Sequence, residues 1–209
     1  MALTSSQLLA VAPVIPVVVL PDAAAAIPLA ESLRRGGIGV IEVTLRTSAG
    51  LEAIRRIASE VPGIVVGAGT VTTPSAAEDA RAAGAQFLVT PGATPALVDA
   101  AQATGLPILP GAATVSEVLA LVERGLTNLK FFPAEASGGL DYLASVASVL
   151  PDVAFCPTGG IASATAADYL ALPNVSCVGG SWLTPPDAVA AGDWELVEKL
   201  AREADGLRR

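Results

Sequence analysis

One strand and one helix can be recognised in the sequence VIEVTLRTSAGLEAIRRIASE, residues 40–60. From Ile41 to Leu45 the side chains alternate between apolar and polar, which is the period of a strand with two different faces. From Leu51 onward the apolar side chains recur every three or four residues, as in a helix with one buried face. Similar pairs follow one another along the rest of the chain. This repetition is typical of βα units arranged around a parallel sheet.

Eight short runs of β-branched and apolar residues are predicted to be strands: 14–20, 40–45, 64–66, 87–89, 107–109, 128–132, 153–156 and 175–178. Their starts recur every ~23 residues, close to the spacing in a (β/α)8 barrel. Outer helices are predicted at 24–35 and 51–60, a short helix closing the barrel floor at 4–11, and an amphipathic closing helix at 193–203. We therefore expect the α/β class and one (β/α)8 TIM barrel domain over residues 1–209, with a short N-terminal helix.

An open, doubly wound sheet is the alternative architecture. Such sheets more often have about five to seven strands and carry a glycine-rich phosphate fingerprint after the first one. Here the first predicted strand leads into Pro21 and Asp22 without a glycine, and the stretch Gly67-Ala68-Gly69 lacks the third glycine at Thr72. These residues disfavour a dinucleotide-binding fold.

The composition describes a globular chain with few ionisable side chains. Of 209 residues, 52% are hydrophobic and 15% charged, enough apolar material for a large core. The formal net charge of −8 argues against a sequence-independent nucleic-acid surface and against anchoring to anionic membranes. Histidine is absent, and Lys130 and Lys199 are the only lysines. A base or an amine nucleophile must therefore come from a short list of residues.

A mean hydropathy of +0.60 raises the question of a membrane span. The uncharged opening of the chain is long enough for one, but Pro13, Pro16 and Pro21 would break it as a helix. No basic residue precedes it, as one would in a secretory signal. We expect a soluble, cytoplasmic protein in which Cys156 and Cys177 are buried thiols rather than a disulfide.

Polar side chains interrupt the predicted strand at 40–45. The alternation places Glu42, Thr44 and Arg46 on one face and the apolar side chains on the other, so the polar set is expected to point into the barrel. In barrels of this type the active site lies at the carboxyl ends of the strands. Burial raises the pKa of a carboxyl group, as a general acid or base near neutrality requires. A structural ion pair between Glu42 and Arg46 accounts for the pattern equally well.

Lys130 occupies a similar place in the predicted strand at 128–132, with Phe132 on the same face. Burial lowers the pKa of an amine and frees it to attack a carbonyl carbon, which makes Schiff-base formation its natural chemistry. The alternative is a snorkelling lysine whose stem covers apolar surface. We favour the nucleophile because lysine is seldom buried and this chain has so few.

Glycines follow the last two predicted strands, in TGG at 158–160 and GGS at 179–181. The loops after strands seven and eight form the common phosphate site of these barrels, where glycines let backbone N–H groups approach an oxyanion. Steric turn requirements are the alternative for either glycine pair. Thr70 and Pro91 complete the predicted rim, where such residues are more often part of a turn than ligand contacts.

Five blocks of the sequence match the motifs of one enzyme family. The blocks are VIEVTLRT (40–47), VGAGTV (66–71), KFFPAE (130–135), FCPTGG (155–160) and GGSW (179–182). In this order they resemble the 2-keto-3-deoxy-6-phosphogluconate (KDPG) aldolase and 4-hydroxy-2-oxoglutarate (KHG) aldolase family. The resemblance implies a class I aldolase of the Entner–Doudoroff pathway that needs no metal or cofactor and is usually a homotrimer. It cleaves the phosphorylated keto acid into pyruvate and glyceraldehyde 3-phosphate.

The resemblance also implies a role for individual residues. Lys130 would form the imine with the C2 carbonyl of the substrate, Glu42 would transfer protons, and Thr158 would control stereochemistry. The pyruvate end would be held by Arg46, Thr70, Pro91 and Phe132, and the phosphate by Gly159, Gly160, Gly179, Gly180 and Ser181.

Other activities remain open from the residues alone. An aldolase for the 6-phosphogalactonate epimer, or for 4-hydroxy-2-oxoglutarate, would use the same imine chemistry. A phosphosugar isomerase or epimerase needs the phosphate loops and a carboxylate base, but it gives an interior lysine no covalent role. A non-catalytic barrel would bind a small phosphorylated ligand without releasing pyruvate. No reading involves nucleic acid or a membrane.

Overall fold

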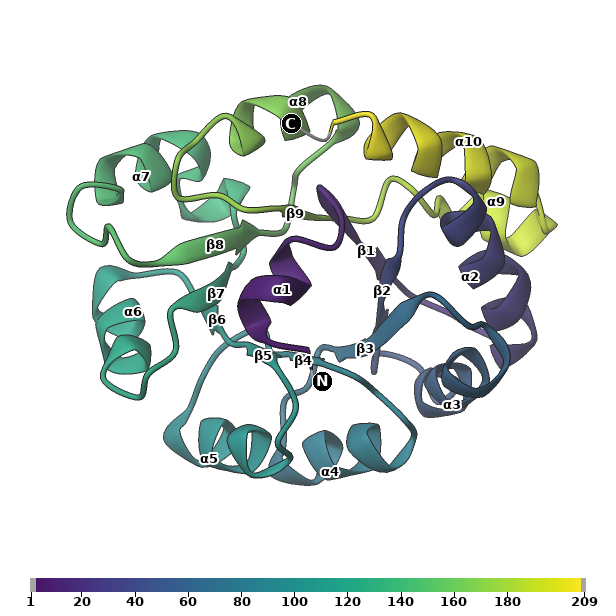
Figure 1. Cartoon of the computed structure of the whole chain (residues 1–209), viewed down its shortest axis with the longest axis horizontal. Coiled ribbons are helices and arrows are strands. Elements are labelled where there is room, and N and C mark those ends of the chain that lie inside the picture. The colour runs from purple at the N-terminus through teal and green to yellow at the C-terminus, as the bar shows by residue number, and fades with distance from the viewer. Residues whose placement is uncertain (1–2, 208–209) are drawn as a thin grey trace.

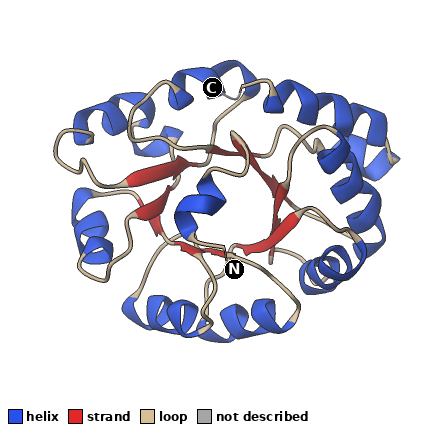
Figure 2. Cartoon of the chain, in the orientation of Figure 1, coloured by secondary structure: helices blue, strands red, loops and turns tan. Residues whose placement is uncertain are grey.

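Parallel strands form a closed ring in the computed structural model, which describes residues 3–207 (Figures 1 and 2). The strands are β1 (Val14–Val18), β2 (Val40–Thr44), β3 (Val65–Gly69), β4 (Leu88–Val89), β5 (Ile108–Leu109), β6 (Gly111–Ala112), β7 (Asn128–Phe131), β8 (Ala154–Pro157) and β9 (Val178–Gly180). One sheet has the order β5-β4-β3-β2-β1-β9 and the other β6-β7-β8. Single bridges close the ring between these sheets: Phe155 of β8 pairs with Val175, which precedes β9, and Thr158, directly after β8, pairs with Gly179 of β9.

Helices surround the ring (Figure 2). They are η1 (Ala23–Ala25), α2 (Ala26–Arg35), α3 (Gly50–Glu60), α4 (Pro74–Ala82), α5 (Pro95–Ala103), α6 (Val115–Val122), η2 (Glu135–Ser137), α7 (Gly139–Val146), α8 (Ser163–Leu170), α9 (Pro186–Ala191) and α10 (Trp194–Asp205). The predicted helix at 24–35 is found as η1 followed by α2, and that at 51–60 as α3. The (β/α)8 barrel is therefore confirmed.

Strands β5 and β6 occupy one place in the ring and are separated only by Pro110. A proline has no N–H to offer a strand ladder. The next N–H, that of Gly111, donates instead to the Thr90 side chain, with 3.2 Å between N and Oγ1. Because β5 pairs with β4 and β6 with β7, the two pieces together serve as the fifth strand, which the sequence predicts at 107–109.

Glycines lie inside two strands whose bounds differ from the predicted ones. Strand β3 extends beyond 64–66, and β9 starts where the predicted run 175–178 ends. Gly179 and Gly180, predicted to form a turn after the last strand, belong to β9 and pair with β1. A Cβ at Gly179 would lie 2.2 Å from Oγ1 of Thr158. The glycine is needed for the close approach of a neighbouring side chain, which a sequence pattern does not distinguish from a turn.

Threonines set the start of three consecutive helices. Thr73 and Thr94 each accept a hydrogen bond from a backbone N–H three residues further on, and each precedes a proline in the first turn. Thr114 begins α6 with a capping box in which Glu117 accepts from the Thr114 N–H. A second backbone N–H, that of Ala113, lowers the pKa of the Glu117 carboxyl group. Local sequence thus fixes where these helices begin.

The helix α1 (Ser5–Leu9) lies across the middle of the ring in Figure 1. Its Leu8 and Leu9 side chains are buried. The hydroxyl of Ser5 donates to the backbone oxygen of Ile108, the first residue of β5, at 3.2 Å. The helix therefore closes the end of the barrel at which the strands begin. This confirms the short N-terminal helix predicted at 4–11.

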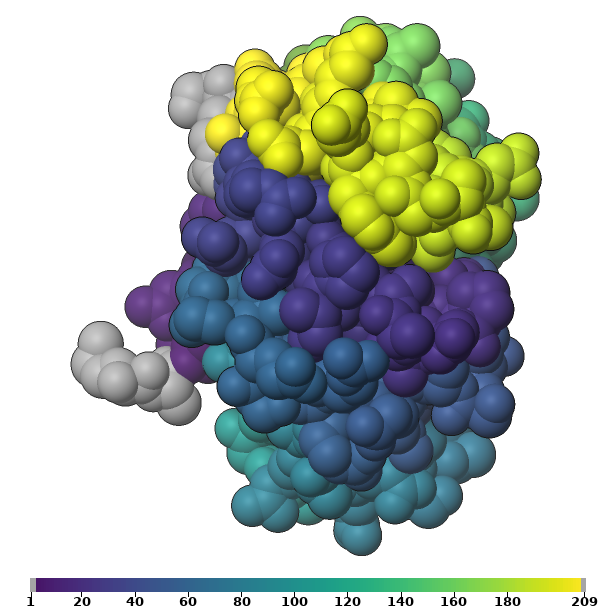
Figure 3. Space-filling view, turned by 90° about the vertical axis from the view of Figure 1, so that its right-hand side faces the viewer, coloured from purple at the N-terminus to yellow at the C-terminus, as the bar shows by residue number. Residues whose placement is uncertain are grey.

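The last helix, α10, packs on α2 and brings the C-terminal part of the chain beside its N-terminal part (Figure 3). Val197 and Ala201 are buried, and a Cβ at Gly36 would lie 2.4 Å from the Ala201 Cβ. At the exposed edge, Arg35 Nε donates to Glu198 Oε2 at 2.8 Å. Exposed ion pairs contribute little to stability, so the close apolar contact is what holds α10.

The interior is mainly apolar, with a small number of buried polar residues. The charged residues among them are Glu42 and Lys130. Within residues 3–207, no helix is both long enough and apolar enough to cross a membrane.

Candidate active site

Two ionisable side chains meet inside the barrel. Glu42 projects from β2 and Lys130 from β7, as the alternation of each strand predicts. The Lys130 Nζ lies 3.4 Å from the Glu42 Oε1, and the two residues are 4% and 3% exposed. Glu42 thus has Lys130 as its ion-pair partner, and Lys130 does not extend to solvent. Neither the pair with Arg46 nor the snorkelling lysine describes this arrangement.

Strand β7 holds Lys130 close to both of its neighbours in the ring. Its backbone pairs with Gly111 of β6 and Cys156 of β8, and its N–H donates to the oxygen of Pro110 at 3.0 Å. The ring of Phe132 has its centroid 5.2 Å from the Lys130 Nζ. An aromatic face at this distance attracts a cation and keeps water from one side of it.

The carboxyl group of Glu42 occupies space that Gly69 of β3 leaves open. A Cβ at Gly69 would lie 2.1 Å from the Glu42 Oε1, a distance that real Cβ atoms essentially never show. Strands β2 and β3 pair with Thr44 opposite Gly69. Any side chain at position 69 would therefore displace the carboxylate from its place beside Lys130.

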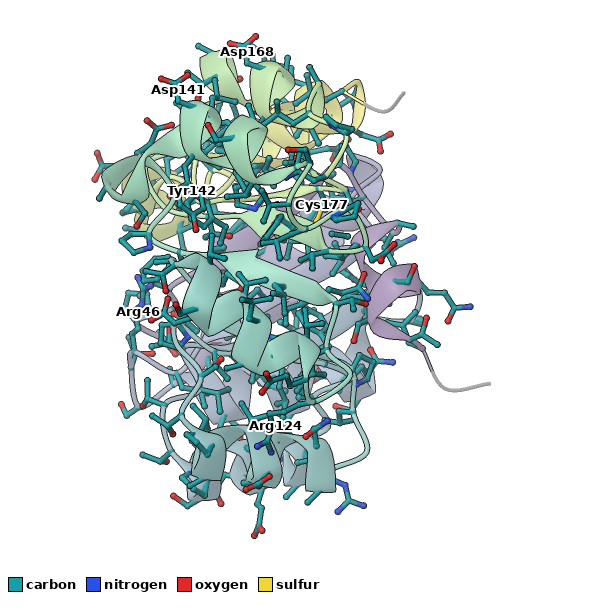
Figure 4. All side chains as sticks on the ribbon, turned by 90° about the vertical axis from the view of Figure 1, so that its left-hand side faces the viewer. Arg46, Arg124, Asp141, Tyr142, Asp168 and Cys177 are labelled. Carbon is teal, nitrogen blue, oxygen red and sulfur yellow. The ribbon has the colours of Figure 1, made fainter. Side chains whose placement is uncertain are left out.

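Arg46 and Thr70 form a second contact at the end of the barrel opposite α1, where Figure 4 shows Arg46. The Arg46 Nε donates to the Thr70 Oγ1 at 3.1 Å. Thr70 has φ 57° and is the one residue other than glycine with a positive φ among residues 3–207. This conformation costs about 1–2 kcal/mol for an L-residue. Thr70 thus has a strained backbone conformation directly after β3, and its hydroxyl accepts a hydrogen bond from the guanidinium group.

Pro91 follows β4 at the same end of the barrel and is half-buried. A Cβ at Gly111 would lie 2.3 Å from the Pro91 oxygen, so the Pro91 backbone is pressed against β6. Because Gly111 pairs with Lys130, Pro91 lies one strand away from the buried amine.

The loop after β8 is tied to the segment after β7. The N–H of Ala134 donates to the oxygen of Thr158 at 2.8 Å, and that of Glu135 to the oxygen of Gly159 at 3.1 Å. Gly159 and Gly160 have φ 104° and 84°, a region that favours glycine. Two backbone hydrogen bonds therefore hold the start of the predicted phosphate loop, and the next two positions have a backbone conformation that favours glycine.

The remaining predicted residues lie at β9. Thr158 is 6% exposed, and its side chain fits against Gly179. A Cβ at Gly180 would lie 2.0 Å from the ring of Trp182, so this glycine also leaves room for a side chain. Ser181 follows the strand and is exposed. Close packing is thus enough to explain why glycine stands at positions 179 and 180.

Two free thiols lie within the same part of the barrel wall, as predicted for Cys156 and Cys177. Cys177, seen inside the fold in Figure 4, is completely buried. A hydrogen bond with Cys156, together with burial and the charge of Glu42, raises the pKa of the Cys177 thiol well above its usual value. Cys177 therefore stays neutral. No group of three or more histidine, cysteine, aspartate or glutamate residues in 3–207 is placed to hold a metal ion.

The structure thus joins the predicted residues in three groups. Glu42, Lys130 and Phe132 form one, Arg46 and Thr70 a second, and the loop at 158–160 with β9 the third. Sequence reasoning missed the fit of Gly69 against Glu42, which joins two different strands. It also missed a contact between Glu135 and Tyr169, which lie 34 positions apart.

Comparisons with known proteins agree with this fold and arrangement. The family model described as KDPG and KHG aldolase matches residues 6–200. The chain is 48% identical over 201 residues to 2-dehydro-3-deoxy-phosphogluconate aldolase from Pseudoalteromonas atlantica and 49% identical over 201 residues to KHG/KDPG aldolase from Escherichia coli. Each alignment covers 96% of this chain and 94% of the relative.

A solved structure of KDPG aldolase from Legionella pneumophila, with pyruvate captured at low pH as a covalent carbinolamine intermediate, has the same fold. It is 44% identical to this chain and superimposes with a TM-score of 0.95, covering 97% of this chain and 98% of the other. Identity of this extent over nearly the whole of both chains goes beyond a shared barrel. The chain belongs to the KDPG and KHG aldolase family.

Proposed function

We propose that this protein is a class I aldolase that cleaves 2-dehydro-3-deoxy-6-phosphogluconate into pyruvate and glyceraldehyde 3-phosphate through an imine on Lys130. The observation that carries the proposal is the Lys130 amine, 4% exposed and 3.4 Å from the Glu42 carboxylate. The covalent carbinolamine of pyruvate in the Legionella relative supports the same chemistry here. The KHG/KDPG aldolase from Escherichia coli supports activity toward 4-hydroxy-2-oxoglutarate as well.

The first step joins Lys130 to the substrate. Glu42 takes a proton from the ammonium group, which leaves a neutral amine able to attack the C2 carbonyl carbon. The carbonyl oxygen takes a proton from the attacking nitrogen and becomes the hydroxyl of a carbinolamine. Glu42 then gives its proton to this hydroxyl, which leaves as water. The product is a protonated imine. Its positive charge replaces the ammonium charge beside the carboxylate, so the buried charge balance is kept.

The second step breaks the bond between C3 and C4. Its electron pair moves into the iminium and forms an enamine, while Glu42 accepts the proton of the C4 hydroxyl, directly or through a water. The aldehyde half then departs. Protonation of the enamine at C3 gives the pyruvate imine, and water releases pyruvate and restores the Lys130 amine. A carboxylate must carry these protons because the chain has no histidine.

Arg46 and Thr70 hold the carboxylate of the pyruvate half in this proposal. The Arg46 Nε is already used by Thr70, which leaves the outer nitrogens of the guanidinium for a paired contact with a carboxylate. Pro91 and the ring of Phe132 form the walls beside the amine and exclude water from the imine.

Backbone N–H groups hold the phosphate. The residues are Gly159 and Gly160 in the loop after β8, and Gly179, Gly180 and Ser181 at the end of β9. This explains how a chain with a net charge of −8 binds an anion without a basic cluster. Thr158 precedes Gly159 and bridges to Gly179, and in this proposal it contacts the aldehyde half and selects its stereochemistry.

Preference between the gluconate and galactonate epimers rests on Thr158. Imine chemistry gives Lys130 a role that a phosphosugar isomerase or a binding protein would not. A homotrimer in the cytoplasm is expected from the resemblance to the family.

Trapping with pyruvate tests the proposal. Borohydride reduction in the presence of pyruvate should leave a stable adduct on Lys130, identified by peptide mass spectrometry. Lys199, which is 70% exposed, is the internal control, since an exposed amine should remain unlabelled. Absence of an adduct, or an adduct on Lys199, would contradict the mechanism. Rates of pyruvate release from the three keto acids, followed with lactate dehydrogenase, would then rank the substrates.

A further inference from the structure

A buried tyrosine links helix α8 to the segment that follows Lys130. The ring of Tyr169 is completely buried, and its hydroxyl donates to the Oε1 of Glu135 at 2.5 Å. This is a short hydrogen bond to a charged acceptor. Burial, together with this bond, raises the pKa of the Tyr169 phenol. The hydroxyl therefore keeps its proton, and can donate to Glu135, at pH values where an ordinary phenol begins to ionise.

The side chain of Glu135 crosses over the predicted phosphate loop to reach Tyr169. A Cβ at Gly160 would lie 2.5 Å from the Cγ and 2.7 Å from the Cβ of Glu135. The Glu135 N–H donates to the oxygen of Gly159 at 3.1 Å. On the far side, a Cβ at Gly139 would lie 3.0 Å from the Tyr169 hydroxyl. Both ends of the contact are thus packed against glycine backbone.

Glycine alone does not hold a loop in one shape. It populates positive and negative φ about equally, so Gly159 and Gly160, at φ 104° and 84°, need an outside restraint to stay as they are. Binding of an anion by backbone N–H groups is strongest when those groups are already fixed in place. The Glu135 side chain, held at its far end by Tyr169, supplies that restraint.

The hydrogen bond from Tyr169 also fixes the direction in which the Glu135 carboxylate points. A carboxylate near a phosphate would repel it, with an energy that grows as the site is shielded from water. Although Glu135 is exposed, its Oε1 is held at the Tyr169 hydroxyl, on the side of α8. The tyrosine thereby keeps the carboxylate from turning toward the loop N–H groups.

We propose that Glu135 and Tyr169 form a positioning pair that holds residues 158–160 in the shape that binds the substrate's phosphate. The proposal rests on the proposed function above. Neither residue touches the reacting atoms, so the pair acts on the affinity for phosphorylated ligands and leaves imine formation at Lys130 intact.

Two substrates that differ in the phosphate provide the test. Tyr169→Phe keeps the ring and removes the hydroxyl, and we expect KM for the phosphorylated keto acid to rise about 10-fold. KM for 4-hydroxy-2-oxoglutarate, which has no phosphate, and trapping of pyruvate should stay at the wild-type values. Glu135→Ala should match Tyr169→Phe. Glu135→Gln, which still offers an acceptor to the tyrosine, should restore most of the affinity.

Tyr142→Phe is the matched control. Tyr142 stacks on Phe131 with ring centroids 5.0 Å apart, and its hydroxyl is buried with no hydrogen-bond partner among residues 3–207. Its removal should leave both KM values unchanged. An equal rise in both KM values for Tyr169→Phe, or a lower melting temperature with unchanged KM values, would mean that the contact only stabilises the fold and would overturn the proposal.

Direct titration with inorganic phosphate by calorimetry separates this proposal from the aldolase assignment. Phosphate affinity about 10-fold weaker in Tyr169→Phe than in Tyr142→Phe supports the positioning pair, even for a protein that pyruvate and borohydride fail to label. Equal phosphate affinity in these two variants, or no phosphate binding by the wild type, overturns the positioning pair, whatever the trapping experiment gives.

Discussion

The two halves of the site are made from different parts of the chain. At β2 and β7, opposite charges on two buried side chains, Glu42 and Lys130, meet across the barrel. The loop 158–160 and β9 hold four glycines and no charged side chain, so the phosphate site we propose there would consist mainly of backbone N–H groups. The chemistry of the first half depends on which side chain is present. The shape of the second half depends on where side chains are missing.

Glycines nevertheless support both halves, and they do so in the same way. Gly69 leaves room for the carboxyl group of Glu42, and Gly179 leaves room for the hydroxyl of Thr158. Each lies on a strand next to that of the side chain it accommodates. The difference between the halves is therefore not that only one uses glycine. In one half the accommodated group is the buried carboxylate beside Lys130, and in the other it is the hydroxyl of Thr158.

Loss of the Glu42 charge should have the largest effect. We expect Glu42→Gln to lower kcat by roughly 10²-fold or more, because the amide cannot carry protons and the chain has no histidine to replace it. Glu203→Gln is the control, since this exposed carboxylate pairs with Lys199 on the surface of α10. The lactate-dehydrogenase-coupled assay measures both. An unchanged rate in Glu42→Gln would mean that the buried pair is structural. The first half would then not depend on the chemistry of its side chains.

Displacing the same carboxylate should come next. In Gly69→Ala the new Cβ would lie 2.1 Å from the Glu42 Oε1, so the carboxyl group must move away from Lys130. We expect kcat to fall by about 10²-fold, approaching the loss of the acid–base group itself. Gly39→Ala is the matched control, because its Cβ would lie 3.5 Å from Val11, an ordinary contact.

A double variant shows whether Gly69 acts through Glu42. If it does, adding Gly69→Ala to Glu42→Gln should cost little further activity, since the displaced group is already inactive. If the fold-losses of the two single variants multiply in the double variant, Gly69 acts on another group, for example on Thr70, its neighbour in the chain.

Sequence alone predicted the side-chain half well. A lysine or glutamate on the inner face of an apolar strand is unusual, and the alternation that marks the strand also fixes where the side chain points. The sequence therefore places Lys130 and Glu42 inside the barrel. What the pattern could not decide was the partner of Glu42, because Lys130 is 88 positions away.

The backbone half was harder to predict. A glycine pair in sequence is compatible with a turn, a close approach or an anion site. The sequence predicts a turn for the pair at 179–180, which belongs to β9. The cause is a contact with Thr158 that depends on the closed ring. Tyr169 carries no local signal either, since in a helix it reads as an ordinary core aromatic.

A change at Gly179 should affect selectivity more than rate. A Cβ there would lie 2.2 Å from the Thr158 Oγ1, so Gly179→Ala should shift this threonine, which we propose contacts the aldehyde half. We expect the ratio of kcat/KM for the gluconate and galactonate epimers to change about 10-fold, while pyruvate trapping on Lys130 persists. Gly92→Ala is the control, because nothing lies within 4 Å of its Cβ. Loss of trapping in Gly179→Ala would mean that the two halves are not separable.

The smallest expected effect is on stability at high pH. It concerns Tyr169, which lies beside the half of the site formed by the loop 158–160 and β9. Burial, with Glu135 as acceptor, raises the pKa of Tyr169 above its ordinary value of 10.0. Above that pH the unfolded chain loses the phenol proton while the folded chain keeps it, so stability falls as pH rises. Below it the contribution is fully present. The difference in unfolding free energy between wild type and Tyr169→Phe, from urea titrations, should thus be constant up to about pH 10 and then shrink by at most about 1.4 kcal/mol per pH unit. A difference that stays constant to about pH 11 would mean that burial and the hydrogen bond to Glu135 do not hold the phenol proton in the folded chain.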